Sequence, residues 1–384
     1  MFKNKALILA KKETGGYGVD PTPTTAVNAI LCDLPVVEPV FKRMERLNVK
    51  AFLGNRPAIS LGEAVKISFN TEVRGSGDST PNTPPEIGVL FVGCGMLETV
   101  TVVSASVELT CATAGDTITR ANGSFITEGF EVGDTITTNL SVNTGPFTVT
   151  QVETLVLHVS QNLTDEGPTA SKVVTAQKVK YTPQDDMDGP SITIYFWQDG
   201  HKYIIVGARG NWSLEATAGE FAKIKWDFTG LYAGPADVTI PTDAVFNATI
   251  PPALKSATFM LGSFAGVIEN FKLDYGNEIV KRPSANASTG FLAQFIKDRK
   301  VVAQIDPEAD VLSAFDPIAL VTGGTEQTMA ISVGTTVGNR MVLSCPKVVM
   351  DTAKYADREN ILTWDGSLLV CPSAGEDDVA VKFN

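Results

Sequence analysis

Apolar and polar residues alternate with a period of two along many short stretches of this chain. Within Glu63–Arg74, for example, the apolar residues Val65, Ile67 and Phe69 are separated by polar ones. Successive side chains of a strand point to opposite faces of a sheet, so this period is typical of half-buried β-strands. Similar runs, separated by Gly, Pro and Thr, recur along the chain. They predict a mainly β protein with minor α content.

Two segments depart from the alternation and predict one short helix each. Thr83–Met96 begins with prolines and ends with glycines around an apolar stretch, which is the usual polarity of a short buried helix. Pro307–Thr322 has an acidic first turn and an apolar body. Pro317 lies inside that body and is expected to interrupt the helix.

The second half of the chain repeats the pattern of the first. Ile192–Pro235 and Met329–Pro372 each contain a β-type run, a Gly turn, a second apolar run and a closing proline. Each also carries a Trp-Asp pair, at Trp226-Asp227 and Trp364-Asp365. The two segments share a pattern but few identities. They indicate two tandem copies of one β module, an arrangement that suits rings and stacks.

The repeat divides the chain into three parts. Residues 1–100 together with 179–240 are expected to form the first module, including an N-terminal arm, and residues 241–384 the second. Residues 101–178 have no counterpart in the second half and contain short β-type runs. We interpret them as a small all-β domain, inserted at a loop and expected on the outer surface.

Composition narrows the function. The chain has 384 residues, of which 43% are hydrophobic, and a formal net charge of −12. This charge argues against a surface that grips nucleic-acid phosphates. The five cysteines are odd in number and never in a C-x-x-C arrangement, so no disulfide framework or zinc site is indicated. The apolar stretch near the N-terminus is too short for a signal peptide or membrane span, and synthesis in a cytoplasm is expected.

Candidate catalytic and ligand-binding residues are few. The two histidines, His158 and His201, lie in or beside β-type runs, away from any nucleophile elbow. Asp185–Gly189 partly matches a calcium loop but lacks the distant glutamate, so a solvated turn is favoured. We therefore expect no enzyme activity, no cofactor and no metal.

Several motifs carry a resemblance to a known family. They are YGVDPTPT at Tyr17–Thr24, NAIL at Asn28–Leu31, and the stretches Gly207–Ala216, Asp227–Pro235, Phe271–Pro283 and Ile296–Asp306. In combination they resemble the tail tube proteins of long-tailed bacteriophages of the siphovirus type, in the form with two tube modules per chain. The resemblance covers nearly the whole chain except residues 101–178.

The resemblance implies a module of two packed β-sheets with a flanking helix. It implies rings of six modules around an open lumen, built from three chains, with six chains as the alternative. Stacked rings would form the tail tube of the virion, assembled in the host cytoplasm, through which the genome passes during ejection. The implied partners are other copies of the chain, the tape measure protein and the tail terminator. Genomic DNA would pass without specific binding, and no membrane is involved.

Two sets of residues are candidates for this function. The segment Lys11–Leu34 is expected to leave the body and contact the neighbouring ring, so that deleting Lys3–Val19 would leave folded subunits unable to form long tubes. Its candidate contact residues are Tyr17, Val19, Pro21 and Pro23. Acidic residues are expected to dominate the lumen wall, because they repel phosphate. The lumen candidates are Glu63, Glu72, Asp298 and Asp306.

Two other classes of function remain open from sequence. Tandem β domains with a β insertion also occur in surface-display and adhesion proteins, which would be expected to carry a secretion signal and an anchor. An enzyme that uses paired carboxylates is the third candidate class. Rings or tubes of the purified protein in electron micrographs would favour the tube protein over both.

Overall fold

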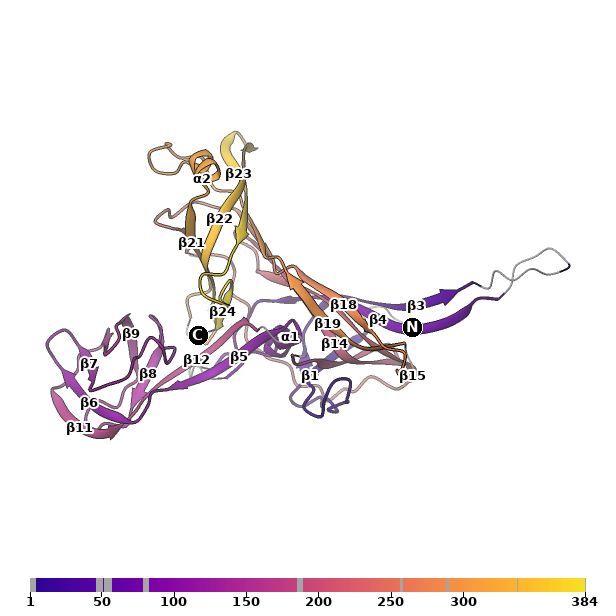
Figure 1. Ribbon diagram of the computed structural model, residues 1–384, viewed down its shortest axis with the longest axis horizontal. Coiled ribbons are helices and arrows are strands. Elements are labelled where there is room, and N and C mark those ends of the chain that lie inside the picture. The colour runs from indigo at the N-terminus through magenta and orange to yellow at the C-terminus, as the bar shows by residue number, and fades with distance from the viewer. Residues whose placement is uncertain are drawn as a thin grey trace.

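A computed structural model describes residues 5–45, 51, 57–78, 83–184, 189–255, 258–287, 290–336 and 338–383. Strands dominate this part of the chain, which confirms the prediction of a mainly β protein with minor α content. Figure 1 shows three lobes that meet near α1, with one long hairpin projecting away from them.

The first half of the chain, without residues 104–173, contributes nine strands and one helix to the described structure. They are β1 (Ala6–Lys12), β2 (Ala29–Ile30), β3 (Asp33–Met44), β4 (Ile59–Glu72), α1 (Gly88–Gly93), β5 (Met96–Val103), β12 (Val174–Pro183), β13 (Ile192–Gln198), β14 (His201–Thr217) and β15 (Lys223–Asp237).

The second half contributes nine further strands and a second helix. They are β16 (Phe259–Leu261), β17 (Asn270–Asp274), β18 (Asn277–Pro283), β19 (Phe291–Arg299), β20 (Val302–Ile305), α2 (Pro317–Gly323), β21 (Glu326–Val333), β22 (Met341–Arg358), β23 (Ile361–Val370) and β24 (Ala380–Phe383).

Both halves build the same arrangement. Each has a long hairpin, then a short helix, then three antiparallel strands, the last of which pairs back onto the hairpin. In the first half the hairpin is β3–β4, and β15 returns to β4. In the second half β17 and β18 form one side of the hairpin, β19 and β20 the other, and β23 returns to β20. The three-stranded units β13–β15 and β21–β23 coincide with the two repeated sequence segments.

Corresponding β-bulges strengthen the match between the halves. Trp226 pairs with Trp212 in the β14–β15 ladder, and Trp364 pairs with Tyr355 in the β22–β23 ladder. A register shift follows three residues from each of these pairs, beginning at Arg209 in β14 and at Thr352 in β22. Bulges bend a strand at a fixed place. The two halves therefore share their bend as well as their strand order.

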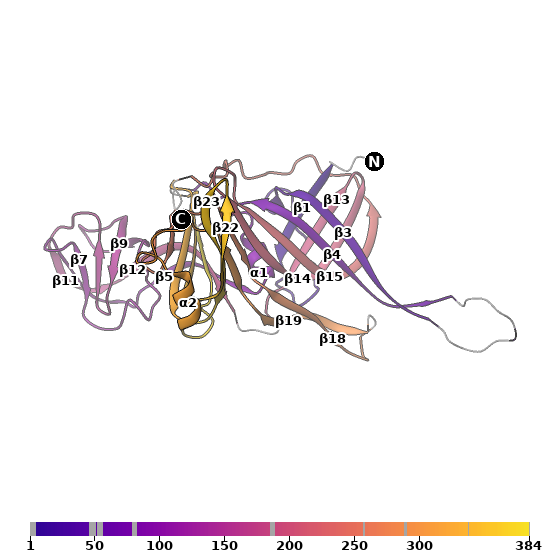
Figure 2. The ribbon, with the colours of Figure 1, turned by 90° about the horizontal axis from the view of Figure 1, so that it is seen from above.

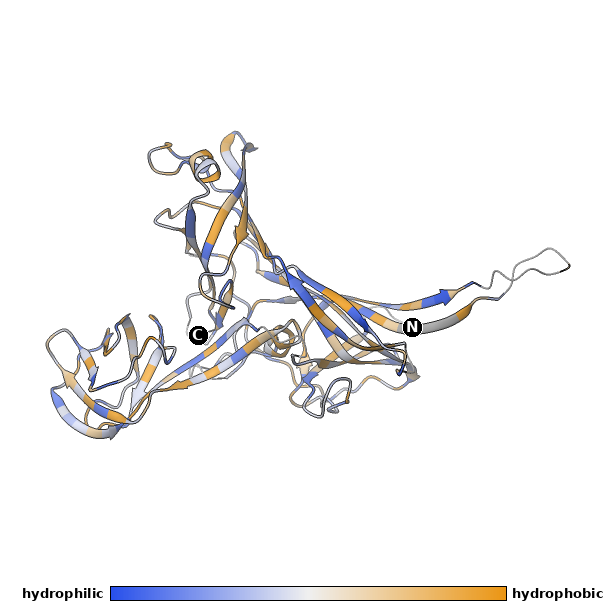
Figure 3. Ribbon diagram, in the orientation of Figure 1, coloured by the Kyte–Doolittle hydropathy of each residue, from blue (hydrophilic) through white to orange (hydrophobic). Residues whose placement is uncertain are grey.

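One sheet runs through both halves. Residues 213–217 of β14 pair with β17 of the second half, so the hydrogen-bonded order is β3-β4-β15-β14-β17-β20-β23-β22-β21-β16. Figure 3 shows apolar and polar residues alternating along these strands. The two modules are thus joined by strand pairing as well as by the chain.

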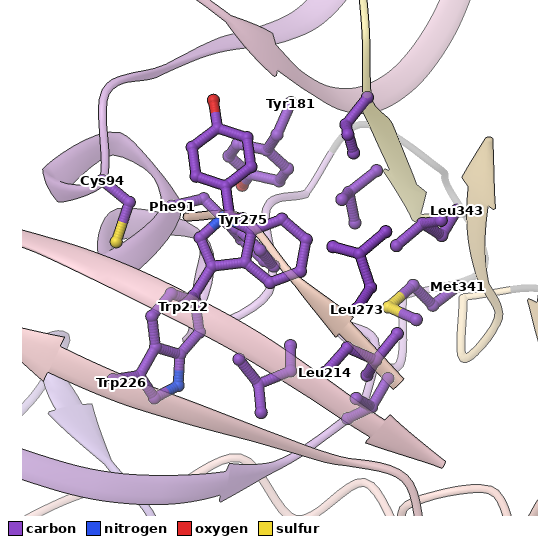
Figure 4. Close-up of a cluster of buried hydrophobic side chains, with 14 of the residues drawn as sticks. Phe91, Cys94, Tyr181, Trp212, Leu214, Trp226, Leu273, Tyr275, Met341 and Leu343 are labelled. Carbon is purple, nitrogen blue, oxygen red and sulfur yellow. The ribbon is translucent and has the colours of Figure 1, made fainter. Parts of the chain in front are cut away.

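The core at the meeting point of the lobes is aromatic. Phe91 of α1 packs edge-on against Trp212 and Trp226, with ring centroids 5.3 and 5.0 Å apart, and stacks on Tyr181 at 5.1 Å. Tyr275, from the junction of β17 and β18, stacks on Trp212 at 5.2 Å. Figure 4 shows these rings converging from both halves of the chain. Large buried aromatic groups of this kind dominate core stability.

The position of α2 corrects one expectation. Pro317 was expected to interrupt a helix over residues 307–322, but it instead occupies the first turn of α2. Proline suits that position because its missing N–H is one that the helix leaves unpaired anyway. The Asp316 carboxylate caps the helix by accepting from the Ala319 N–H at 3.0 Å. The residues before it form turns instead of a helix.

The segment between β5 and β12 has a hydrophobic core of its own. Its strands are β6 (Val107–Ala112), β7 (Thr117–Arg120), β8 (Thr135–Thr138), β9 (Phe147–Val152), β10 (Val156–Val159) and β11 (Glu166–Lys172). Buried residues from Val107 to Ala176 form a cluster separate from the main core. The paired strands β5 and β12 connect this lobe to the body (Figure 1).

A buried ionic cluster ties this lobe to the body. Asp134, fully buried beside β8, contacts the ammonium groups of Lys178 on β12 and Lys382 on β24. Lys180 pairs with Glu131, and although burial raises the pKa of Glu131, the neighbouring Lys180 and Lys178 charges bring it below its usual value. Removing residues 101–178 would therefore leave Lys382 without its partner Asp134. The sequence analysis did not predict this contact between the lobe and the body.

We predict that Asp134→Asn destabilises the chain by about 3–5 kcal/mol, because it leaves two lysines partly uncompensated in a buried site. Urea unfolding followed by tryptophan fluorescence measures the loss. Glu108→Gln, an exposed carboxylate on β6 of the same lobe, is the matched control and should change the free energy of unfolding by less than about 0.5 kcal/mol. Equal effects of the two substitutions would contradict the structural role of the cluster.

Candidate assembly surface

The through-running sheet has two unequal open edges. In the described part of the chain, β3 forms a ladder with β4 alone, so its other side is unpaired. On the opposite side of the molecule, β21 covers β22 only as far as Val349, and the β22 segment from Asp351 to Arg358 pairs there with β23 alone. Unpaired backbone groups of this kind are ready sites for pairing with another strand.

The β3–β4 edge carries exposed apolar side chains. Phe41 is 43% exposed and touches Tyr232 edge-on at 5.9 Å, while Val36, Met44 and Ile59 are also exposed. This hairpin projects far from the body (Figures 1 and 2). Clustered apolar groups on a projecting hairpin mark an interaction surface.

The outer end of β22 and β23 is the second apolar surface. Tyr355 is 58% exposed and stacks on the buried Trp364 at 4.1 Å. Ile361 and Leu362 beside it are exposed as well, as is Ile318 of the nearby α2. The two edges of the sheet thus each present an exposed aromatic ring with aliphatic neighbours.

The two long hairpins of the chain lie side by side (Figure 2). A groove of about 480 Å³ between them is lined by Val36, Lys66, Ile279 and Lys281, among others. The pKa of Lys281 lies below its usual value because of burial and then because of the nearby Lys42 and Lys66 charges. The groove carries both signs of charge, because Glu38 and Asp227 line it together with Lys66 and Lys281.

The polar face of the sheet carries both signs of charge in ion pairs. Lys272 of β17 pairs with Glu215 of β14 at 3.2 Å, and Lys225 pairs with Asp227 on β15 at 3.0 Å. These residues alternate with the buried ones and so share the face away from the core. Paired ammonium groups are less available to phosphate than free ones.

Two of the lumen candidates form ion pairs with arginines. Glu72 pairs with Arg74 at 3.1 Å. Asp306 pairs with Arg358 at 3.0 Å and accepts the Asn270 backbone N–H at 2.9 Å, which anchors the start of β17. Both carboxylates thus have structural partners, and their charge reaches the solvent in part only.

The other two lumen candidates lie on the hairpins. Asp298 of β19 is exposed and accepts the Arg299 backbone N–H at 2.8 Å. Glu63 of β4 pairs with Phe41 in the β3–β4 ladder, and its side chain is outside the described part. Glu63 and Glu72 share β4, Asp298 lies in the two-stranded sheet β18–β19, and Asp306 follows β20. The position of the four acids in a lumen stays a prediction.

A buried carboxylate holds the N-terminal segment to the body. Glu13 accepts hydrogen bonds from the Ser191 and Thr193 hydroxyls at 2.5 and 2.6 Å and from the Gly18 and Gly207 backbone N–H groups, both at 2.7 Å. Four donors compensate the loss of water around the charge. Glu13 therefore acts as an anchor between β13, β14 and the loop after β1.

Tyr17 is the second anchor of this loop. Its hydroxyl accepts the Gln294 backbone N–H at 2.9 Å, and the Arg209 guanidinium lies 5.3 Å from its ring. Burial raises the pKa of Tyr17, although Gln294 and Arg209 oppose the shift. Its ring packs so closely on Gly207, whose φ is +60°, that a Cβ there would lie 2.6 Å from a ring carbon. The loop thus contacts both halves of the chain.

These contacts correct the expectation of an arm. The segment Lys11–Leu34 does not leave the body in this chain: Lys11 donates to the Pro21 carbonyl at 2.9 Å, and β2 pairs with β1. Pro23 is buried, Tyr17 and Pro21 are half-buried, and Val19 is exposed. A contact of these residues with another ring stays a prediction, and of the four Val19 is the most accessible to it.

We predict that Glu13→Ala frees the loop over residues 14–24 without unfolding the sheet, because it leaves four donors without their acceptor. Hydrogen exchange at the amides of Gly18 and Gly207 should accelerate by at least about tenfold, since a hydrogen bond to a charged group is worth about 1.5–3 kcal/mol. Glu220→Ala, an exposed acid in the turn between β14 and β15, serves as control. Unchanged exchange in Glu13→Ala would show that the other contacts of the loop, including those of Tyr17 and Lys11, are enough to hold it.

The two histidines lie far from each other in the structure. His158 and His201 contact Glu153 and Asp237, respectively, each at 3.4 Å and on different lobes. Among the described residues no group of three or more potential metal ligands is present. The calcium-like stretch at Asp185–Gly189 lies almost wholly outside them. No helix in the described part is long and apolar enough to cross a membrane.

Comparison of the sequence with protein-family models and with curated proteins finds no match. Any inference about function therefore depends on the sequence and structure of this chain.

Proposed function

We propose that this protein is a structural virion protein that oligomerises into stacked rings and forms the tail tube of a long-tailed bacteriophage. Each chain supplies two tube modules, so three chains close a ring of six modules around a lumen for the genome. Copies of the chain are its main partners, with the tape measure and tail terminator proteins as further ones.

One observation carries the proposal: the sheet passes from the first module to the second through the β14–β17 ladder and ends in open strands at both sides. A repeated module that is already joined to its like by strand pairing can continue the same pairing with another chain. Closed rings leave no edge unpaired, which removes the tendency of open edges to aggregate. The ion-paired polar face supports passage of DNA without specific binding.

Electron microscopy and native mass measurement of the purified protein test this proposal. We expect rings with a central hole, each with three times the 40.9 kDa mass of one chain, and tubes at higher concentration. Rings of six chains would overturn the argument from duplication. A protein that stays monomeric at every concentration, without rings or tubes, would overturn the proposed function and favour a surface-display or adhesion role.

A further inference from the structure

The junction between the two modules shows how a strand of one module pairs with a strand of the next. In the β14–β17 ladder, Ser213 pairs with Asp274 and Glu215 with Lys272. The ladder extends by one step, because the Tyr275 N–H donates to the Trp212 carbonyl at 3.1 Å and the two rings stack. The accepting strand belongs to the three-stranded unit, and the incoming strand belongs to the long hairpin.

The ladders within each module fix which residues correspond. Trp226 and Trp364 hold the same place in the two repeats, so their partners Trp212 and Tyr355 correspond. Two residues further along, Phe228 pairs with Ile67 and Gly366 with Ile305. Ile67 and Ile305 therefore correspond on the hairpins.

The ladder partners also match residues on the outer strands of the two hairpins. Ile67 pairs with Val37, and Ile305 pairs with Phe271, so Val37 and Phe271 correspond. Four residues further along each strand, Phe41 corresponds to Tyr275. The buried pair Trp212–Tyr275 inside the chain thus has two exposed counterparts, Tyr355 and Phe41, on the two open edges.

The helices of the two modules also differ in how many of their residues are buried. The α1 helix has five buried residues, and the Asn277 side chain of the β18–β19 hairpin closes its end by donating to the Cys94 carbonyl at 2.8 Å. In α2, only Pro317 is buried, and Ile318 is exposed. Most of the cover of α1 comes from β1, β5, β13 and β14 of the same module, and the β18–β19 hairpin adds the contact at its end.

We propose that the β3 edge of one copy of this chain pairs with the β22 edge of the next in the register of the internal junction. Phe41 of one copy then stacks on Tyr355 of the other, Val40 lies opposite Ala356, and the β3–β4 hairpin reaches the end of α2. This inference rests on the proposed ring and names the residues that join its chains.

Pro39, one of the two prolines in β3, fits this register. Phe41 takes the place of Tyr275, whose N–H points to the accepting strand, and backbone groups alternate sides along a strand. Pro39, two residues away, therefore has its missing N–H on the open side and removes no bond to β4. An edge strand tolerates a proline whose nitrogen faces the open side of the sheet. It leaves the Phe41 N–H as a donor and limits pairing with unrelated strands.

Disulfide cross-linking tests the register. Val40 and Ala356 correspond to Asp274 and Ser213, a pair without mutual hydrogen bonds, whose Cα atoms are typically about 4.5 Å apart and within reach of a disulfide. The Val40→Cys/Ala356→Cys chain is oxidised after assembly and run on a denaturing gel without reductant. We expect conversion to a covalent three-chain species that reductant reverses to monomer.

The matched control is Val36→Cys/Ala356→Cys, which places the thiol on the same strand face but about 13 Å away. It should show no more cross-linking than the parent chain with its five native cysteines. Rings in the micrographs with no cross-link in the first variant, or with equal cross-linking in both, would overturn the register and leave the ring intact. Absence of both rings and cross-links in all samples would overturn the ring as well.

Discussion

Replacing Phe41 with aspartate is expected to abolish ring formation while the chain stays folded. Phe41 lies on an open edge, so its loss removes little from the monomer, but in the ring it would stack on Tyr355 beside the buried Trp364. Central aromatic residues of interfaces typically contribute at least about 2 kcal/mol, or about 30-fold in affinity. A ring repeats this loss at every contact between chains.

Analytical ultracentrifugation over a concentration series measures the effect, and thermal unfolding checks the fold. Val132→Asp is the matched control, because it places the same carboxylate at an exposed valine of the lobe between β5 and β12. It should leave both assembly and stability unchanged. Rings of Phe41→Asp at the concentration that suffices for the unaltered chain would show that β3 is not the assembling edge.

Deleting residues 1–12 is expected to unfold the chain, the opposite of the sequence-based expectation for a deletion of Lys3–Val19. The structure argues against that expectation because β1 is a core strand: it pairs with β13 along its whole length, and Leu7, Ile8 and Leu9 are buried. Burying three such side chains contributes on the order of 5–9 kcal/mol. A typical domain has a total stability of about 5–15 kcal/mol.

Circular dichroism and cooperative thermal unfolding test this deletion. A milder version compares Ile8→Asp, in the core of β1, with Val27→Asp in the exposed turn before β2. The first should lower the melting temperature sharply, and the second should leave it nearly unchanged. A deletion variant that still melts cooperatively would restore the idea of a dispensable arm.

The sequence predicted those features that depend on local pattern. Alternation predicted the strands, and the two Trp-Asp pairs aligned the repeated units, because these signals lie within single strands. It failed where partners far apart in sequence decide the outcome. Glu13 looks like a charge after an apolar run, and only the donors of Ser191, Thr193 and Gly207 make it an anchor.

The residues that we propose for assembly were missed for a related reason. Phe41 and Tyr355 look like ordinary apolar positions of β-strands, and their exposure depends on which neighbouring strands are absent. A direct alignment of the two repeats from Trp226 and Trp364 does not match Trp212 with Tyr355, because the turn from β14 to β15 is longer than the turn from β22 to β23. The correspondence follows only from the ladder partners, which pair Trp212 with Trp226 and Tyr355 with Trp364.

The β14–β17 junction has a consequence for the speed and economy of assembly. Every association of free chains loses translational and rotational freedom, at an estimated 4–15 kcal/mol per event. When two modules share one polypeptide, every second junction of the proposed ring forms during folding, at the high effective concentration of a tethered partner. A ring of doubled chains therefore needs two encounters where single modules would need five. It can nucleate at lower protein concentration and has fewer partly closed intermediates with exposed strand edges.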